Sequence, residues 1–125
     1  MKRWALSALS IAAMVAAATL TIAVEPASAS TTVGGYVECV SENSVVGVWV
    51  DAASGTDGWA TRSGSGYYQH WQYTLTSGNS YSLHVGCGGS SSNWRWAVNC
   101  PSATGGHSFN VYDGDIVTHP FCQQV

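Results

Sequence analysis

The stretch Tyr67–Cys87 reads YYQHWQYTLTSGNSYSLHVGC, and its period of two predicts a pair of half-buried β-strands. In the first strand every second residue from Tyr67 to Leu75 falls on one face. In the second strand the face that ends at Cys87 collects Tyr81, Leu83 and Val85. Ser77-Gly78-Asn79 predicts a tight hairpin turn between them, in which Gly78 or Asn79 takes a positive φ.

The same alternation continues on both sides of this pair, and no helix signal follows residue 30. Further strands are expected at 36–40, around Val46, Val48 and Val50 with Trp49 on the other face, at 94–100, around Phe109 and Val111, and at 116–122. The Gly- and Ser-rich segments 51–66, 88–93 and 101–106 are expected to be loops, with 88–93 flexible. About seven short strands predict an all-β fold, a compact antiparallel β-sandwich with two disulfides.

The first 29 residues differ in kind from the rest. Lys2 and Arg3 precede an apolar, alanine-rich run, and Ala27-Ser28-Ala29 offers the small residues that signal peptidase requires. A transmembrane anchor is the competing interpretation, but polar residues, Pro26 and the cleavage triplet argue against it. We therefore interpret residues 1–29 as a cleaved signal peptide, residues 30–125 as a single secreted domain, and the protein as extracellular with no membrane span.

The predicted mature domain has few charges. It contains no lysine, and Arg62 and Arg95 against six carboxylates give it a net charge of −4 with neutral histidine. Nucleic acids and anionic membranes are bound through basic patches, so neither is expected as a partner. Five tryptophans, six tyrosines and many valines are enough to build a core.

All four cysteines of the chain lie in the predicted mature domain. An even number in a short exported chain indicates two disulfides, for which three connectivities exist. We favour Cys39–Cys87 with Cys100–Cys122, because these pairs close an N-terminal and a C-terminal loop separately. No CxxC pair is present, so the spacing does not fit a zinc site.

Two other groups of residues have the chemistry of metal ligands. The expected hairpin would place His70 and His84 on one outer face, close enough to share a metal. No third ligand is evident, so we interpret them as solvated histidines. Asp113-Gly114-Asp115 lacks the ligand series of a calcium loop and is interpreted as a turn. No metal and no cofactor is therefore expected.

Motifs of enzymes are missing from the chain. No GxSxG or HExxH signature frames the serines, histidines and aspartates, and oxidised cysteines cannot act as thiolates. No pair of carboxylates stands out for glycoside chemistry. We expect a protein that is not an enzyme, and a small hydrolase that uses His70 or His84 is the least favoured alternative.

The triplet Trp94-Arg95-Trp96 is the main candidate binding site. Tryptophan and arginine are enriched in binding hot spots, because they bury large area and retain a polar group. In the alternative interpretation both indoles face inward and Arg95 is merely solvated. Trp59, alone in a Gly-rich segment, is the second candidate, with a lid over one end of the core as its alternative.

A leader followed by a Gly-, Ser- and Trp-rich β domain with four cysteines resembles small secreted actinobacterial proteins. Trp94-Arg95-Trp96 is similar to the Trp-Arg-Tyr triplet that tendamistat-like α-amylase inhibitors present, although theirs lies between the first two cysteines. Size, predicted export and the absence of catalytic motifs resemble the adaptor subunit of streptomycete umbrella toxin particles. These resemblances imply a protein-binding role, as an inhibitor or as an adaptor.

Three hypotheses follow for the function. In the first, the chain is a secreted protein-binding module whose partner is another secreted protein, as adaptor or subunit of an extracellular complex, or as an inhibitor. In the second, it is a carbohydrate-binding module that stacks Trp and Tyr rings on a polysaccharide. The small hydrolase is the third.

Overall fold

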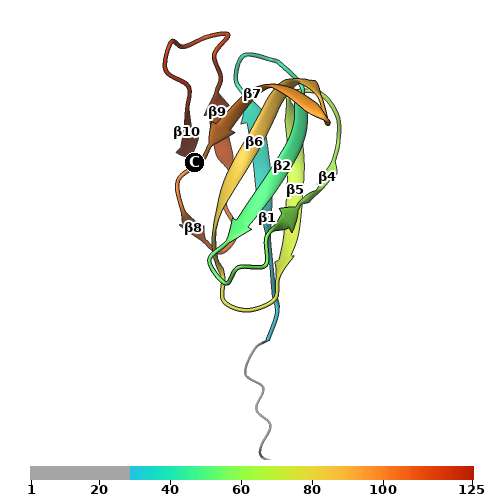
Figure 1. Ribbon diagram of the computed structural model, residues 1–125, viewed down its shortest axis with the longest axis vertical. Helices are drawn as coiled ribbons and strands as arrows, with labels where there is room; N and C mark the ends of the chain where they lie inside the picture. Colours follow the sequence, from blue (N-terminus) through green and yellow to red (C-terminus); the bar gives the residue numbers. More distant parts are fainter. Residues whose placement is uncertain (1–28) are drawn as a thin grey trace, which may run out of the picture.

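The computed structural model describes residues 29–125, so the predicted signal peptide lies outside this range except for Ala29. The described chain forms two β-sheets and no helix, with β2 and β6 crossing in front of β1 and β5 (Figure 1). Sheet A runs in the order β10 (Phe121–Gln124), β9 (Phe109–Tyr112), β1 (Thr31–Cys39), β5 (Tyr68–Leu75) and β4 (Thr61–Ser63). Sheet B runs β3 (Gly58–Trp59), β2 (Val45–Ala52), β6 (Ser80–Ser90) and β7 (Asn93–Asn99), with β8 (Ala103–Thr104) also paired to β6.

These sheets confirm the predicted all-β sandwich. The pairings are antiparallel except that of β1 with β9, which is parallel. The core lies between the sheets and holds the inward residues of both, with Trp71 of β5 packed at 5.4 Å from Tyr81 of β6. The Tyr81 hydroxyl donates to the carbonyl of Gly105, and burial raises the pKa of this phenol to about 12.

The predicted hairpin at 67–87 is wrong. β5 pairs with β1 and β4 in sheet A, whereas β6 pairs with β2 and β7 in sheet B. The chain does bend at 76–79, with Gly78 at φ 69° as expected, but the bend carries the chain from one sheet to the other. Two strands with one apolar face each can bury those faces side by side or against each other, and alternation does not distinguish the two arrangements.

Several element boundaries also differ from the prediction. The segment 88–93 is not a flexible loop, because β6 and β7 pair up to Ser90 and Asn93. Segment 51–66 contains β3 and β4, and the last strand is β10 at Phe121–Gln124, not the expected 116–122. A register shift between Val45 and Gly47 buries Val45 in the core and leaves Val46 half-buried.

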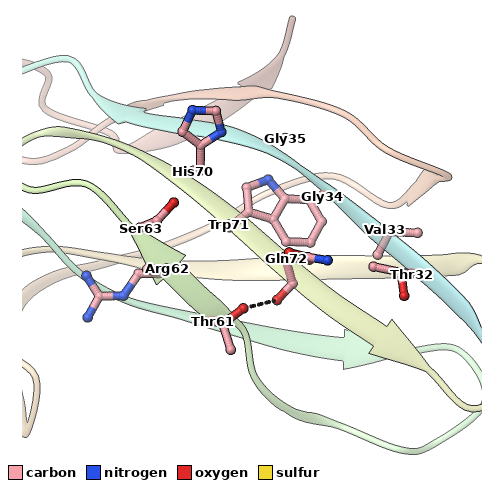
Figure 2. Close-up of a pocket in the computed structure, with 10 residues that line it drawn as sticks. All are labelled: Thr32, Val33, Gly34, Gly35, Thr61, Arg62, Ser63, His70, Trp71 and Gln72. Atoms are coloured by element: carbon pink, nitrogen blue, oxygen red, sulfur yellow. Dashed lines mark hydrogen bonds between the residues drawn. The ribbon is translucent and has the colours of Figure 1, made fainter.

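Sheet A has an outer face of polar side chains over this core. β4 lies along β5 at its edge, and the Thr61 hydroxyl donates to the carbonyl of Gln72 at 3.2 Å (Figure 2). Thr32 of β1 and Thr74 of β5 pair across the strands with their hydroxyls 3.0 Å apart. This face is therefore built from β1, β5 and β4 side by side.

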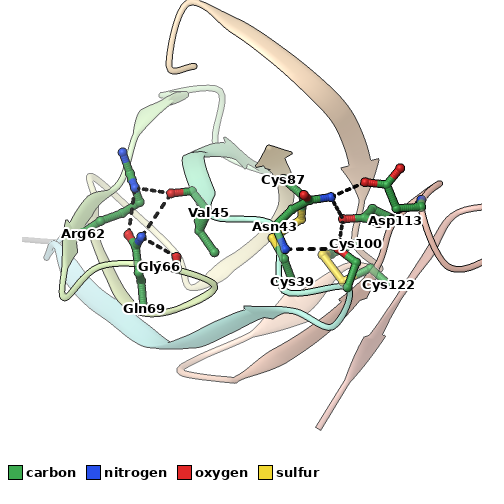
Figure 3. Close-up of a disulfide and its surroundings, with 12 residues drawn as sticks. Cys39, Asn43, Val45, Arg62, Gly66, Gln69, Cys87, Cys100, Asp113 and Cys122 are labelled. Atoms are coloured by element: carbon green, nitrogen blue, oxygen red, sulfur yellow. Dashed lines mark hydrogen bonds between the residues drawn. A yellow bond between two sulfur atoms is a disulfide. The ribbon is translucent and has the colours of Figure 1, made fainter. Parts of the chain in front are cut away.

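The favoured disulfide connectivity is confirmed (Figure 3). Cys39–Cys87 joins β1 of sheet A to β6 of sheet B, and both residues are fully buried. Cys100–Cys122 joins the end of β7 to β10. Each sheet is thus tied covalently to the other, at about 2–4 kcal/mol for each bridge. Two disulfides are compatible with an extracellular protein.

A buried carboxylate fixes the turn that follows β9. Asp113 is fully buried and accepts hydrogen bonds from the Ser41 hydroxyl (2.6 Å), the Asn43 amide (3.2 Å) and the backbone N–H of Asp115 (3.1 Å). The predicted turn at Asp113–Asp115 is confirmed, and its first residue holds the loop between β1 and β2 in place (Figure 3). Buried carboxylates persist where such donors satisfy them.

Candidate functional site: a tryptophan face on sheet B

Three tryptophans gather on the outer face of sheet B. Trp59 of β3 lies directly opposite Trp49 of β2, with ring centroids 4.9 Å apart at an interplanar angle of 83°. The Trp94 ring lies 5.8 Å from Trp59 at 68°. Trp59 is 58% exposed, whereas Trp49 and Trp94 are half-buried. We call these three residues the tryptophan face.

Two glycines make room for the Trp94 ring. A Cβ added to Gly86 of β6 would lie 2.3 Å from the indole, and one added to Gly47 of β2 would lie 2.5 Å from it. Gly86 stands between the core residues Val85 and Cys87, so its missing side chain points to the outer face. The Trp94 ring therefore packs against neighbouring glycines of two strands.

Alternation fails within the triplet Trp94-Arg95-Trp96. Trp94 belongs to the tryptophan face, whereas Trp96 packs against the core and against Gly114, where an added Cβ would meet its ring at 2.5 Å. The triplet does not form one surface. The structure brings Trp59 together with Trp94 and separates both from Trp96.

Arg95 is held at the turn after β9. Its guanidinium donates to the Asp115 carboxylate at 3.0 Å and lies 6.0 Å from the Trp96 ring centroid. The pKa of Asp115 is lowered, chiefly by the hydrogen bond from the Asn43 amide at 2.6 Å, and the charge of Arg95 contributes less. Arg95 thus has an intramolecular partner, Asp115, in the turn that follows β9.

The second arginine lies beside the tryptophan face. The Arg62 guanidinium donates to the carbonyls of Val45 (2.8 Å) and Val46 (3.2 Å) and to the Gln69 side chain (2.7 Å). These carbonyls belong to the part of β2 that extends beyond β3, so Arg62 satisfies backbone groups at a sheet edge (Figure 3). A cavity of about 150 Å³ between Arg62, Val46 and Trp59 adjoins the exposed indole.

The two histidines do not share a face. His70 lies on β5 of sheet A, with its ring centroid 4.0 Å from that of Tyr36, whereas His84 lies on β6 of sheet B. The His84 Nδ1 is 2.5 Å from the Asn99 side-chain oxygen, and its Nε2 is 3.7 Å from Asp51. The expected neighbourhood is wrong because the 77–79 turn crosses between sheets. Residues 29–125 contain no group of three His, Cys, Asp or Glu side chains that could hold a metal.

No protein-family model, curated protein or solved structure matches the chain. Residues 29–125 contain no helix that could span a membrane.

The sequence predicted two of the three residues of the tryptophan face, Trp59 and Trp94. It also placed Trp49 on the strand face opposite to the core valines, but did not assign it to the site. The missing information was the register Trp49↔Trp59, which depends on where β3 pairs along β2.

Proposed function

We propose that this protein is a secreted, non-enzymatic protein-binding module that docks through the tryptophan face onto another secreted protein, as an adaptor or subunit of an extracellular assembly. The observation that carries the proposal is the 58% exposed indole of Trp59, which packs against Trp49 and Trp94. Exposed tryptophans of this kind are the residues most enriched among binding hot spots. An inhibitor of a secreted enzyme would use the same surface.

Pre-organisation supports a protein partner. Trp59 lies on a two-residue strand at the edge of sheet B, and its neighbours keep the indole in place before any partner arrives. A side chain that is already ordered loses little conformational entropy when it is buried. The adjoining cavity of about 150 Å³ offers room for a small apolar side chain of the partner.

Ring geometry favours a protein over a polysaccharide at this face. The three indoles meet at 83° and 68° instead of lying in one plane. A sugar chain stacks on the flat faces of aromatic rings, and these angles offer it the face of one ring at a time. The edge of a tilted ring suits the irregular surface of a folded protein.

The contacts of His84 and His107 support a role without catalysis for these two histidines. His84 uses its hydrogen bond on the Asn99 amide, and His107 uses its own on the backbone carbonyl of Thr104. A general base that activates a nucleophile needs a hydroxyl or thiol within hydrogen-bond reach. The hydrogen bonds of His84 and His107 go to a side-chain amide and a backbone carbonyl instead.

Affinity capture from the culture supernatant of the producing organism tests the proposal. The tagged protein is expected to recover one specific partner, and Trp59→Ala is expected to lose it. Phe121→Ala is the matched control, because Phe121 is also an exposed ring, at 46%, but lies on sheet A. Recovery of the unaltered protein as a lone monomer, or equal capture by Trp59→Ala, would contradict the proposal.

A further inference from the structure

A groove crosses the outer face of sheet A, on the opposite side of the sandwich from the tryptophan face. It has a volume of about 560 Å³ and is lined by β1, β5 and β4 (Figure 2). The register explains the hollow, because Gly34 of β1 lies opposite Gln72 of β5 and contributes no side chain. On the other side of Gln72 lies Thr61 of β4.

The groove is lined by polar groups that both donate and accept hydrogen bonds. Ser63, His70 and Tyr36 form one cross-strand row, and Thr61 and Gln72 form the next beside Gly34. The side chains of Ser63, His70 and Gln72 are exposed. Among the described residues they have no hydrogen-bond partner, so their polar atoms are free to bind a ligand.

An aromatic cluster adjoins His70 at one end of the groove. The ring of Tyr36 lies 4.8 Å from that of Tyr68 and 4.0 Å from the imidazole of His70, with interplanar angles of 36° and 46°. Tyr68 is 48% exposed. A ligand in the hollow over Gly34 therefore meets polar side chains along its length and an aromatic cluster at its end.

The groove lining contains no carboxylate, lysine or free guanidinium. Arg62 is the charged residue among the groove residues, and its guanidinium is directed to the carbonyls of Val45 and Val46 in sheet B. Glu38 lies directly opposite Tyr68, in the outer row of the aromatic cluster and outside the groove lining. An anionic ligand would find no cation here and would be repelled by the acidic domain.

We propose that this groove is a second binding site, whose ligand is a neutral oligosaccharide chain. Sugar hydroxyls would exchange hydrogen bonds with the Gln72 amide, the Ser63 hydroxyl and the His70 imidazole. The apolar C–H face of a sugar ring would stack on Tyr36. The groove and the tryptophan face lie on different sheets, so the proposal stands independently of the protein partner.

Titration with neutral hexasaccharides tests the site directly. Cellohexaose, xylohexaose, mannohexaose and fully N-acetylated chitohexaose are added to the purified protein, with binding followed by calorimetry and by amide chemical shifts. At least one is expected to bind and to shift the signals of Gly34 and Gln72. Gln72→Ala is expected to weaken that binding about three- to tenfold, as for the loss of one hydrogen bond.

Gln123→Ala supplies the matched control. Gln123 is an exposed glutamine on the same outer face, in β10, and lies away from the groove. Its substitution is expected to leave sugar binding unchanged, as is Trp59→Ala. Absence of binding by all four hexasaccharides overturns the proposal. Equal binding by the Gln72→Ala variant, or loss of binding in the Trp59→Ala variant, would place the sugar site outside the groove and would also overturn the proposal.

Discussion

At the scale of single residues, the surface of sheet B depends on positions that have no side chain. Gly47 and Gly86 lie under the indole of Trp94, which could not rest on the sheet if either carried a Cβ. Both glycines lie within strands, where glycine is otherwise unfavourable. Their cost is offset by the aromatic ring that covers them.

Gly86→Ala is expected to displace Trp94 and to destabilise the fold by about 1–3 kcal/mol, because a Cβ 2.3 Å from the ring overpacks the site. Urea denaturation measures the loss, and tryptophan fluorescence reports the movement of the indole. Ser82→Ala, on the outer face of the same strand, is expected to change stability by less than about 0.5 kcal/mol. Equal stability of the two variants would show that Trp94 does not rest on Gly86.

Asp115 makes stability depend on pH at the acid end. Its pKa is lowered below the ordinary 3.8 in the folded protein, mainly by the Asn43 hydrogen bond. Stability from this group is therefore present above pH 3.8 and is lost as the pH falls through the folded pKa. Denaturation curves between pH 5 and pH 2 are expected to show a shallower acid loss in Asp115→Asn, and an unchanged slope would contradict the assignment.

At the scale of elements, the short strands β3 and β4 close one side of the sandwich. β3 pairs with β2 only at Trp49 and Val50. The side chain of Arg62 in β4 donates hydrogen bonds to the carbonyls of Val45 and Val46, which β3 does not reach. Gln69, buried on β5, joins the same network through Val45 and Gly66. These contacts fix the segment on which Trp59 is carried.

Arg62→Ala is expected to destabilise the protein by about 1–3 kcal/mol, because it removes three hydrogen bonds, two of them part-buried. Arg95→Ala is the matched control, since Arg95 is an exposed arginine paired with a surface carboxylate. Thermal unfolding of both variants is the measurement. A loss in Arg95→Ala as large as that in Arg62→Ala would show that the edge contacts have no special weight.

The elements also show how far sequence patterns reach. Alternation identified the inward faces of β5 and β6, since Trp71, Leu75, Tyr81 and Leu83 are all buried. It did not identify their neighbours, because the same apolar face can pack beside or across from another. Contacts between residues distant in sequence determine the register shift between Val45 and Gly47 and the position of the two-residue strand β3. The assembly of the tryptophan face depends on the same kind of contact.

At the scale of the whole molecule, two disulfides hold a small sandwich together. Cys39–Cys87 spans 48 residues and crosses the core, whereas Cys100–Cys122 spans 22 and closes the C-terminal end. We favoured this pairing from the sequence because it closes two separate loops. In the fold, each of the two disulfides joins sheet A to sheet B.

Removing Cys39–Cys87 by a double Cys→Ala substitution is expected to cost more than removing Cys100–Cys122. Loop entropy alone predicts a difference of about 0.7 kcal/mol, and the loss of two fully buried sulfurs adds to it. Calorimetric melting of the two double variants measures the order. A lower melting temperature for the variant without Cys100–Cys122 would contradict it.

Two separate surfaces follow from the sandwich architecture, one on each outer face. Sheet B presents aromatic rings held at angles, and sheet A presents a neutral polar groove with tyrosines at its end. A module with these faces could hold a protein partner on one side and a saccharide chain on the other. The protein-binding role of Trp59 is the central claim.

Hydroxyl-radical footprinting of the complex isolated from the culture supernatant tests this claim most directly. Oxidation of each aromatic side chain is measured by mass spectrometry in the free and bound protein. The exposed Trp59 is expected to lose most of its oxidation in the complex, while Phe121 on sheet A keeps its own. Undiminished oxidation of Trp59 in a complex that protects other residues would contradict the account.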